Sequence, residues 1–257
     1  MAVKSTGILR KLRSAGVIVP QPSAVFLAPG VNPARIAPGV VLWPGVRLSG
    51  SELSIGPDCE IGTEGPALLV DCQLGRGVRV GSGFLERATL LDGVRVGSFA
   101  HIRPGCLIEE QCTLGESVGL KQTVLMPWAA VGSLVNFCDC LLAGGVGPGR
   151  HSEVGSGFVH FNFTPRQDKA TPSLFGDVPN GVLLASDPVF LGGQGGVVGP
   201  AALPFGAVLP AGCVWRGAAK RFVPRGGGAV LSHGLSPAKA ARVRRLNLSY
   251  LGNLQAL

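Results

Sequence analysis

Two basic residues, Arg103 and Lys121, could together bind an anion. Each follows an aliphatic residue, and they lie 18 residues apart in equivalent positions. If one coil of the fold takes 18 residues, the two cations stack about 5 Å apart, the ordinary spacing of neighbouring strands. Like charges this close repel unless an anion joins them, and an arginine fork with a lysine point charge suits phosphate. We therefore interpret the pair as a candidate phosphate clamp; the alternative is two solvated surface side chains.

A second group of polar residues lies in the stretch VHFNF (159 to 163), which contains His160, Asn162 and Phe163. His160 is a candidate general base because histidine titrates near neutral pH. The alternative is a hydrogen-bonded structural histidine. The stretch VGSLVNFCD (131 to 139) adds Ser133 and Asp139, which with His160 would supply the residue types of a hydrolytic triad. We consider that triad the weaker interpretation.

The segments that position these residues follow a six-residue repeat of aliphatic side chains. A period of six does not keep one face of an α-helix buried, but it suits short strands joined by tight turns. Three hexapeptides would make one triangular turn, so we expect an all-β, parallel β-helix. The aliphatic positions are Leu90, Val96, Ile102, Ile108, Leu114 and Leu120. The fourth residues after them are Val94, Ala100, Cys106, Cys112, Val118 and Val124, and the same frame elsewhere includes Phe84 and Cys213.

Glycine and cysteine clusters are explained by the same repeat. GGVGPGR (144 to 150) and GGQGG (192 to 196) lack a following Walker lysine with Ser or Thr, so we expect turns and not phosphate loops. Cys59, Cys106, Cys112 and Cys213 occupy the small fourth position and are expected in the core. The pair CDC (138 to 140) has the wrong spacing for a common zinc site, and we expect no metal.

The composition favours a turn-rich β protein that accepts anions. The 257 residues include 40 glycines and 20 prolines, and the net charge is +8. That charge permits phosphates, nucleotides or coenzyme A as ligands. Without interleaved aromatic residues, the basic residues do not favour nucleic acid. Seven cysteines without a secretory signal predict reduced thiols and a cytoplasmic protein, and the apolar runs are too short to span a membrane.

We expect three regions along the chain. Residues 1–24 form an N-terminal linker or helix, and residues 25–223 form the β-helix. A polar, proline-rich surface loop is expected around 164–192. Residues 224–257 form a C-terminal arm, in which Ser236 and Pro237 give a good helix start for a helix over 236–257.

One known family resembles this chain in VGSFAHIRPGCLIEEQCTLGESVGLKQ (96 to 122), VGSLVNFCD and VGSGFVHFNF (154 to 163). It is the acetyltransferase domain of the bifunctional UDP-N-acetylglucosamine pyrophosphorylase and glucosamine-1-phosphate N-acetyltransferase family. The resemblance runs from about Leu9 to Val214, with LRSAGVIVPQPS as the linker. It implies a left-handed β-helix, a homotrimer with its site between subunits, acetyl-CoA or another acyl-CoA, and a sugar-phosphate or nucleotide-sugar ligand. We expect the uridylyltransferase domain, and hence the pyrophosphorylase reaction, to be missing.

Carried over by position, Arg103, Lys121 and Asn162 match the family's phosphate- and sugar-binding residues. The acetyl-transfer residues differ. The family's catalytic histidine falls on Ser133 and a nearby tyrosine on Asn136. The remaining assignments are Phe163 in place of a second tyrosine, Glu153 in place of an asparagine, and Ser186 as the coenzyme-side serine.

The replacement of the catalytic histidine leaves three functions open. Acyl transfer to an amine needs a base near neutral pKa, and a serine hydroxyl does not deprotonate an ammonium at pH 7. The first possibility is an acyltransferase with a diverged site. The second is a catalytically silent sugar-nucleotide-binding or scaffold protein. The third is an acyltransferase for a different acceptor, with His160 as base.

Overall fold

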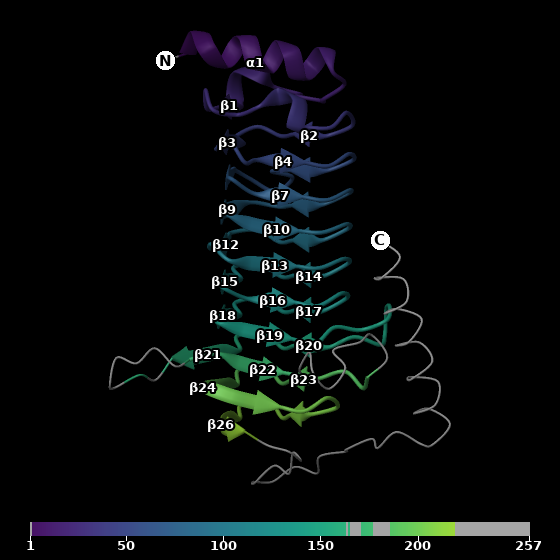
Figure 1. Cartoon of the computed structure of the whole chain (residues 1–257), viewed down its shortest axis with the longest axis vertical. Helices are drawn as coiled ribbons and strands as arrows, with labels where there is room; N and C mark the ends of the chain where they lie inside the picture. The colour runs from purple at the N-terminus through teal and green to yellow at the C-terminus, as the bar shows by residue number, and fades with distance from the viewer. Residues whose placement is uncertain (1, 163, 165–170, 177–185, 219–257) are drawn as a thin grey trace.

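A computed structural model gives the fold of residues 2–162, 164, 171–176 and 186–218. Short parallel strands stack into a column with a helix across its N-terminal end (Figure 1). Each strand pairs in parallel with the strand one coil later, as β10 (Ala88–Leu90) does with β13 (Cys106–Ile108). The column is a β-solenoid of about 10 turns. The all-β parallel β-helix expected from the sequence is thus confirmed.

A complete coil contributes one strand to each of three faces, in the order first, second, third; near the C-terminal end one long strand (Gly196–Leu203) spans the third and first faces. The first face comprises β4 (Ser54–Ile55), β7 (Gln73–Leu74), β10, β13, β16 (Val124–Leu125), β19 (Cys140–Leu142) and β22 (Ser173–Phe175). The second comprises β2 (Val41–Leu42), β5 (Glu60–Ile61), β8 (Arg79–Val80), β11 (Arg95–Val96), β14 (Thr113–Leu114), β17 (Ala130–Val131), β20 (Glu153–Val154), β23 (Phe190–Leu191) and β25 (Val208–Leu209). The third comprises β1 (Phe26–Leu27), β3 (Arg47–Ser49), β6 (Ala67–Val70), β9 (Gly83–Glu86), β12 (Ala100–Ile102), β15 (Gly119–Lys121), β18 (Asn136–Cys138), β21 (Val159–Asn162), β24 (Gly196–Leu203) and β26 (Val214–Ala218).

The six-residue repeat works because every second strand residue points inward and each corner places a further small residue inside. All six aliphatic positions from Leu90 to Leu120 are buried, and Val94, Ala100, Cys106, Cys112 and Val118 are buried with them. These side chains belong to one continuous apolar cluster along the column. Burial of that cluster is the main favourable term that holds neighbouring coils together.

The repeat shortens at two places, and there the residue expected at the inward fourth position, Val124 or Phe84, is not fully buried. Val124 is half-buried and Thr123 takes the inward position, because this coil has 17 residues and pairs Leu107 with Val124. The Thr123 hydroxyl donates to the carbonyl of Lys121 at 2.9 Å, which satisfies the buried polar group. Phe84 is likewise half-buried, and Leu85 is the inward residue of its strand.

The cysteine prediction is confirmed at three of four positions. Cys59, Cys106 and Cys112 are buried, and burial raises the pKa of their thiols to about 11, about 11 and about 12. Cys213 is half-buried and packs against the end of the core. The three buried thiols therefore act as small apolar side chains.

The N-terminal helix α1 (Ala2–Ser14) lies across one end of the stack (Figure 1). Its Leu9 and Leu12 are buried, so the helix shields the first coil from solvent. Two short 3-10 helices follow, η1 (Pro22–Ala24) and η2 (Pro33–Arg35). In the described part of the chain, no helix has the length and apolar character needed to cross a bilayer.

The later segments differ partly from expectation. The GGVGPGR segment forms a turn closed by an antiparallel bridge between Gly147 and Arg150, and Gly193 and Gln194 also lie in a turn. The expected single loop around 164–192 is interrupted by β22 and β23, which continue the first and second faces. The reason is the aliphatic and aromatic residues of these strands, which fill the core position in their coil. The expected C-terminal helix over 236–257 lies outside the described residues.

Candidate functional site on the third face

The outer surface of the third face has two columns of side chains, because alternate strand residues point outward. The central column contains His101, Gly119 and Asn136, which are Cα partners on β12, β15 and β18. The edge column contains Lys121 and Cys138, which are also partners. Arg103 directly follows β12 and begins the same edge column. Six polar, charged or small residues from three coils thus share one outer surface.

The structure places Arg103 and Lys121 on consecutive coils. The amide of Arg103 donates to the carbonyl of Leu120 at 2.8 Å, and Ile102 pairs with Leu120. The local coil therefore has the 18 residues that the stacking argument required. Lys121 is exposed, while Arg103 is half-buried. Nη2 of Arg103 donates to Sγ of Cys138 at 3.2 Å, so its guanidinium extends along the edge column past Lys121.

The central column lacks a side chain at Gly119, and we call this missing side-chain position the recess. This glycine has no side chain, and a Cβ built there would lie 3.6 Å from Nδ2 of Asn136. Asn136 is exposed and borders the recess on one side. His101 is exposed on the other side and contacts the ring of Phe84, with ring centroids 5.5 Å apart.

Ser133 lies at the corner between the second and third faces, after β17 and before β18. Its side chain is half-buried and hydrogen-bonds to the carboxylate of Glu116, which lowers the pKa of that exposed carboxyl. A serine hydroxyl is a far weaker base than an imidazole near pH 7, and a hydrogen bond to a carboxylate does not change that order. Glu116 is the partner that the structure gives to the Ser133 hydroxyl.

His160 lies inside the solenoid and not on its outer surface. Its side chain is 5% exposed, and Nε2 lies 2.7 Å from Oγ of Ser173. Oγ of Ser173 also accepts a hydrogen bond from the amide of Ala201 at 3.0 Å. Burial lowers the pKa of His160, with an opposing effect from Asp139. This interior position does not fit the expected role as a base for a substrate bound outside.

The triad interpretation also does not fit the structure. His160 contacts Ser173, whereas Ser133 interacts with Glu116. The carboxylate of Asp139 accepts a hydrogen bond from Oγ1 of Thr171 at 2.5 Å. The hydrogen-bond partners of the three side chains thus differ, although the charge of Asp139 acts on His160. The alternation of the strand sends His160 inward, whereas Ser133 and Asp139 lie at two different corners.

The remaining predicted site residues are spread over several coils. Asn162 is exposed at the end of β21, on the third face. Ser186 is half-buried in the segment before β23. Glu153 is exposed on β20 and its carboxylate lies 3.1 Å from Nε2 of His151. Phe163 lies outside the described residues.

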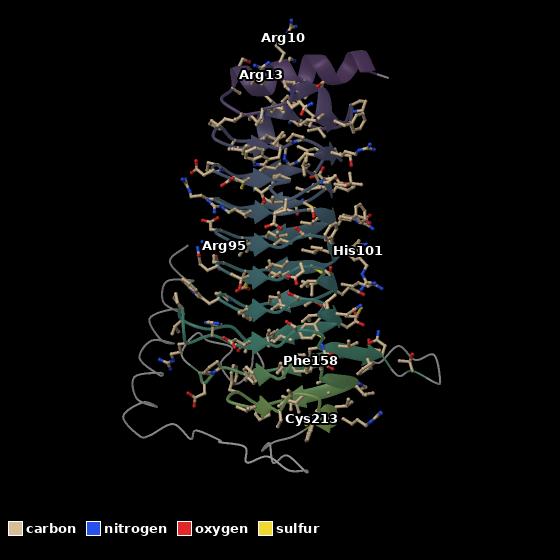
Figure 2. All side chains as sticks on the ribbon, turned by 180° about the vertical axis from the view of Figure 1, so that it is seen from behind. Arg10, Arg13, Arg95, His101, Phe158 and Cys213 are labelled. Carbon is tan, nitrogen blue, oxygen red and sulfur yellow. The ribbon has the colours of Figure 1, made fainter. Side chains whose placement is uncertain are left out.

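Sequence reasoning missed His101 and Cys138 as members of this surface. The sequence did contain a signal for His101. Side chains alternate in direction along a strand, so His101, two residues before Arg103, points outward as Arg103 does. Figure 2 shows His101 and Arg95 on opposite sides of the column. Cys138 was considered only as part of CDC, although its register places it beside Lys121.

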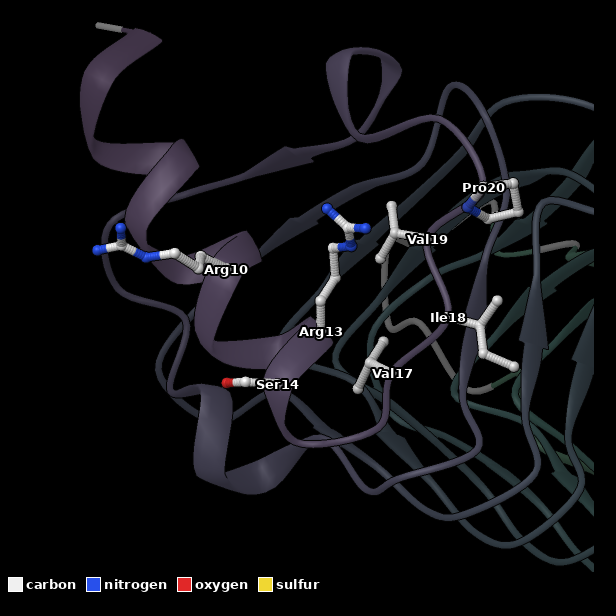
Figure 3. A pocket seen from close by; sticks show the side chains of 7 residues that line it. All are labelled: Arg10, Arg13, Ser14, Val17, Ile18, Val19 and Pro20. Atoms are coloured by element: carbon white, nitrogen blue, oxygen red, sulfur yellow. The ribbon is translucent and has the colours of Figure 1, made fainter.

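A separate pocket of about 580 Å³ lies at the N-terminal end (Figure 3). Two arginines and a serine line it together with apolar residues: Arg10, Arg13, Ser14, Val17, Ile18, Val19 and Pro20. None of the site residues predicted from the sequence belongs to this lining. Among the described residues, no three His, Cys, Asp or Glu side chains gather as a group able to hold a metal ion.

Comparison with known proteins identifies relatives of the chain. A bifunctional protein GlmU of Nocardia farcinica is 33% identical over 223 residues, which are 87% of this chain and 39% of the relative. The chain is a GlmU-related protein. Bifunctional GlmU proteins of Thermus thermophilus and Shouchella clausii are 31% identical over 169 residues and 28% identical over 199 residues. Those matches cover 64% and 77% of this chain, and 35% and 38% of the relatives.

The GlmU relationship confirms the resemblance expected from the sequence, and the β-solenoid is consistent with the acetyltransferase domain of GlmU. Together they support the left-handed sense of winding. The chain spans about two fifths of the length of these curated relatives. No family model matches the chain.

Proposed function

We propose that the chain binds a phosphorylated sugar or nucleotide sugar on the third face and transfers to it an acyl group from an acyl-CoA such as acetyl-CoA. The observation behind this proposal is the register of Arg103 and Lys121, which stacks two cations on one outer surface. A phosphate between them would relieve their mutual repulsion and accept charge-assisted hydrogen bonds from both.

Neighbouring groups support a polar ligand extending from that phosphate. Asn136 and Asn162 are exposed on the same face and offer amide donors and acceptors to sugar hydroxyls. We assign Phe163 to the sugar side and Ser186 to the coenzyme side by their positions in the family pattern. We further propose a homotrimer with the site between subunits. The 41% exposed Phe161 on the third face supports such contact, because a partner subunit would cover its ring.

A second candidate function is a catalytically silent sugar-nucleotide-binding or scaffold protein. This candidate is supported by Ser133, the residue that the resemblance aligns with the family's catalytic histidine, because its hydroxyl hydrogen-bonds to Glu116. The burial of His160 also supports this candidate, because a buried imidazole is a poor substitute base for a ligand on the outer surface. Both functions predict ligand binding at Arg103 and Lys121, and only the first predicts acyl transfer.

The binding half is tested by calorimetric titration with glucosamine 1-phosphate, N-acetylglucosamine 1-phosphate and UDP-N-acetylglucosamine. Replacing both cations, in an Arg103→Ala, Lys121→Ala variant, should weaken binding by at least ~10-fold, because each charge-assisted hydrogen bond contributes about 1.5–3 kcal/mol. The control is Arg95→Ala, an exposed arginine on the second face (Figure 2). Equal affinity of the double variant and the wild type would refute the clamp.

The transfer half is tested with acetyl-CoA and the amino-sugar phosphates while free thiol is measured. Thiol release that depends on the sugar and is lost in the double variant supports the acyltransferase. Sugar-nucleotide binding without affinity for acetyl-CoA supports the silent alternative. Light scattering of the unliganded protein tests the trimer, and a monomer at micromolar concentration would contradict it.

A further inference from the structure

The proposed acyl transfer needs a proton acceptor that the family pattern does not supply. The chain has four histidines. His160 is buried against Ser173, and His151 is held between Glu153 and the carbonyl of Gly147. His233 lies outside the described residues. Among the described histidines, His101 alone has an exposed side chain on the third face.

The surroundings of His101 leave one side of its imidazole open toward the candidate site. Phe84 of the preceding coil packs against the ring at a centroid distance of 5.5 Å and an interplanar angle of 56°. On the following coil, its register partner is Gly119, which contributes no side chain. The ring is therefore supported by Phe84 on one side, and its register partner on the other side has no side chain to cover it.

The recess lies between the two parts of the proposed site. Along the third face, the central column of His101, Gly119 and Asn136 separates the edge column from the corner that contains Ser133. Outward residues two apart on a strand lie about 7 Å from each other. A sugar whose phosphate is held by Arg103 and Lys121 can therefore extend across the recess, within reach of His101.

We propose that His101 is the general base of acyl transfer at this site, an inference that rests on the proposed function. The amine nitrogen of the sugar attacks the thioester carbonyl carbon, so that a C–N bond forms and the C–S bond breaks. His101 accepts the proton that leaves the nitrogen, and the coenzyme thiolate leaves and takes up a proton from solvent. Gly119 provides the space for the sugar, and Asn136 borders it from the opposite side.

The test compares His101→Gln and His101→Ala with Arg95→Gln, an exposed residue on the second face (Figure 2). Each protein is assayed for acetyl transfer to glucosamine 1-phosphate across pH 5.5 to 9, and for binding of the same sugar phosphate by calorimetry. We expect kcat to fall by ~100-fold or more in both His101 variants, the usual contribution of a general base. We expect binding to change by less than about threefold, because the phosphate contacts remain.

Two further readouts separate a base from a structural contact. The acidic limb of the wild-type pH profile should disappear in His101→Gln, and added imidazole should restore part of the rate of His101→Ala. Unchanged kcat in both variants overturns the proposal, as does an equal loss of kcat and binding without rescue by imidazole.

Failure of the inference and failure of the proposed function give different results. A wild-type protein that binds glucosamine 1-phosphate but transfers no acetyl group overturns the base role and leaves the silent binding function. A wild-type protein that binds none of the sugar phosphates overturns the proposed function together with this inference. Turnover that is insensitive to His101 overturns this inference alone.

Discussion

Arg103 and Cys138 lie two coils apart, yet Nη2 of Arg103 donates a hydrogen bond to Sγ of Cys138 at 3.2 Å. Lys121, the register partner of Cys138, lies on the coil between them. One side chain thus links the ends of the edge column. Arg103, which is proposed to hold a phosphate, is thus also in contact with a half-buried thiol.

Cys138 should react with iodoacetamide faster than the buried cysteines. Burial raises the pKa of Cys59, Cys72 and Cys106 to about 11, and those of Cys112 and Cys140 are raised as well. Peptide mass spectrometry of the native protein at pH 7.5 gives the rate at each thiol. We expect alkylation of Cys138 to precede that of the buried thiols because its side chain is half-buried, with half-buried Cys213 as the internal reference. Labelling of Cys112 before Cys138 would contradict this prediction.

Filling the recess at Gly119 should block the ligand without unfolding the protein. A Cβ there meets only ordinary contacts with Asn136, so Gly119→Ala should change the free energy of unfolding by less than about 1 kcal/mol. Gly119→Leu should weaken binding of glucosamine 1-phosphate at least ~10-fold because its side chain occupies the recess. Calorimetry measures the affinity and urea unfolding the stability. Unaltered affinity in Gly119→Leu would place the sugar elsewhere.

His160 should make the protein less stable in mild acid. Burial lowers its pKa in the folded state, whereas in the unfolded state the pKa is about 6.5. The unfolded state therefore binds more protons below that pH, and stability falls as the pH drops from 6.5 toward the folded pKa. Urea unfolding between pH 5 and 7.5 measures the slope. His160→Gln should reduce the slope, and exposed His101→Gln should retain it.

Glu109 should give the free energy of unfolding the opposite dependence on pH, with stability falling as the pH rises. Burial, followed by the charge of Glu110, raises its pKa from 4.5 to about 7. The folded state then holds more protons between these values, so this stabilising contribution is lost as pH rises from about 4.5 to about 7. Glu109→Gln should stabilise the protein at pH 8 by on the order of 1 kcal/mol, after discounting for solvent screening. Urea unfolding at pH 5 and pH 8 tests this, with a smaller gain expected for Glu110→Gln; no gain from Glu109→Gln at pH 8 would refute it.

Much of the fold and part of the site were predictable from local pattern. The six-residue period determined the inward residues from Leu90 to Leu120, because each strand is only two or three residues long and its alternation is visible in the sequence. The same period placed Arg103 beside Lys121. The inward position of Thr123 was not predictable, since a 17-residue coil shifts the frame by one residue without any local marker.

The sequence by itself determined that this chain stacks hexapeptides. Only the tertiary structure decided which of the polar residues face outward. It turned His160 into the core and left His101 exposed beside an empty position at Gly119. The physical reason is that inward or outward direction depends on the register between coils, and one deleted residue reverses it for every residue that follows in the strand.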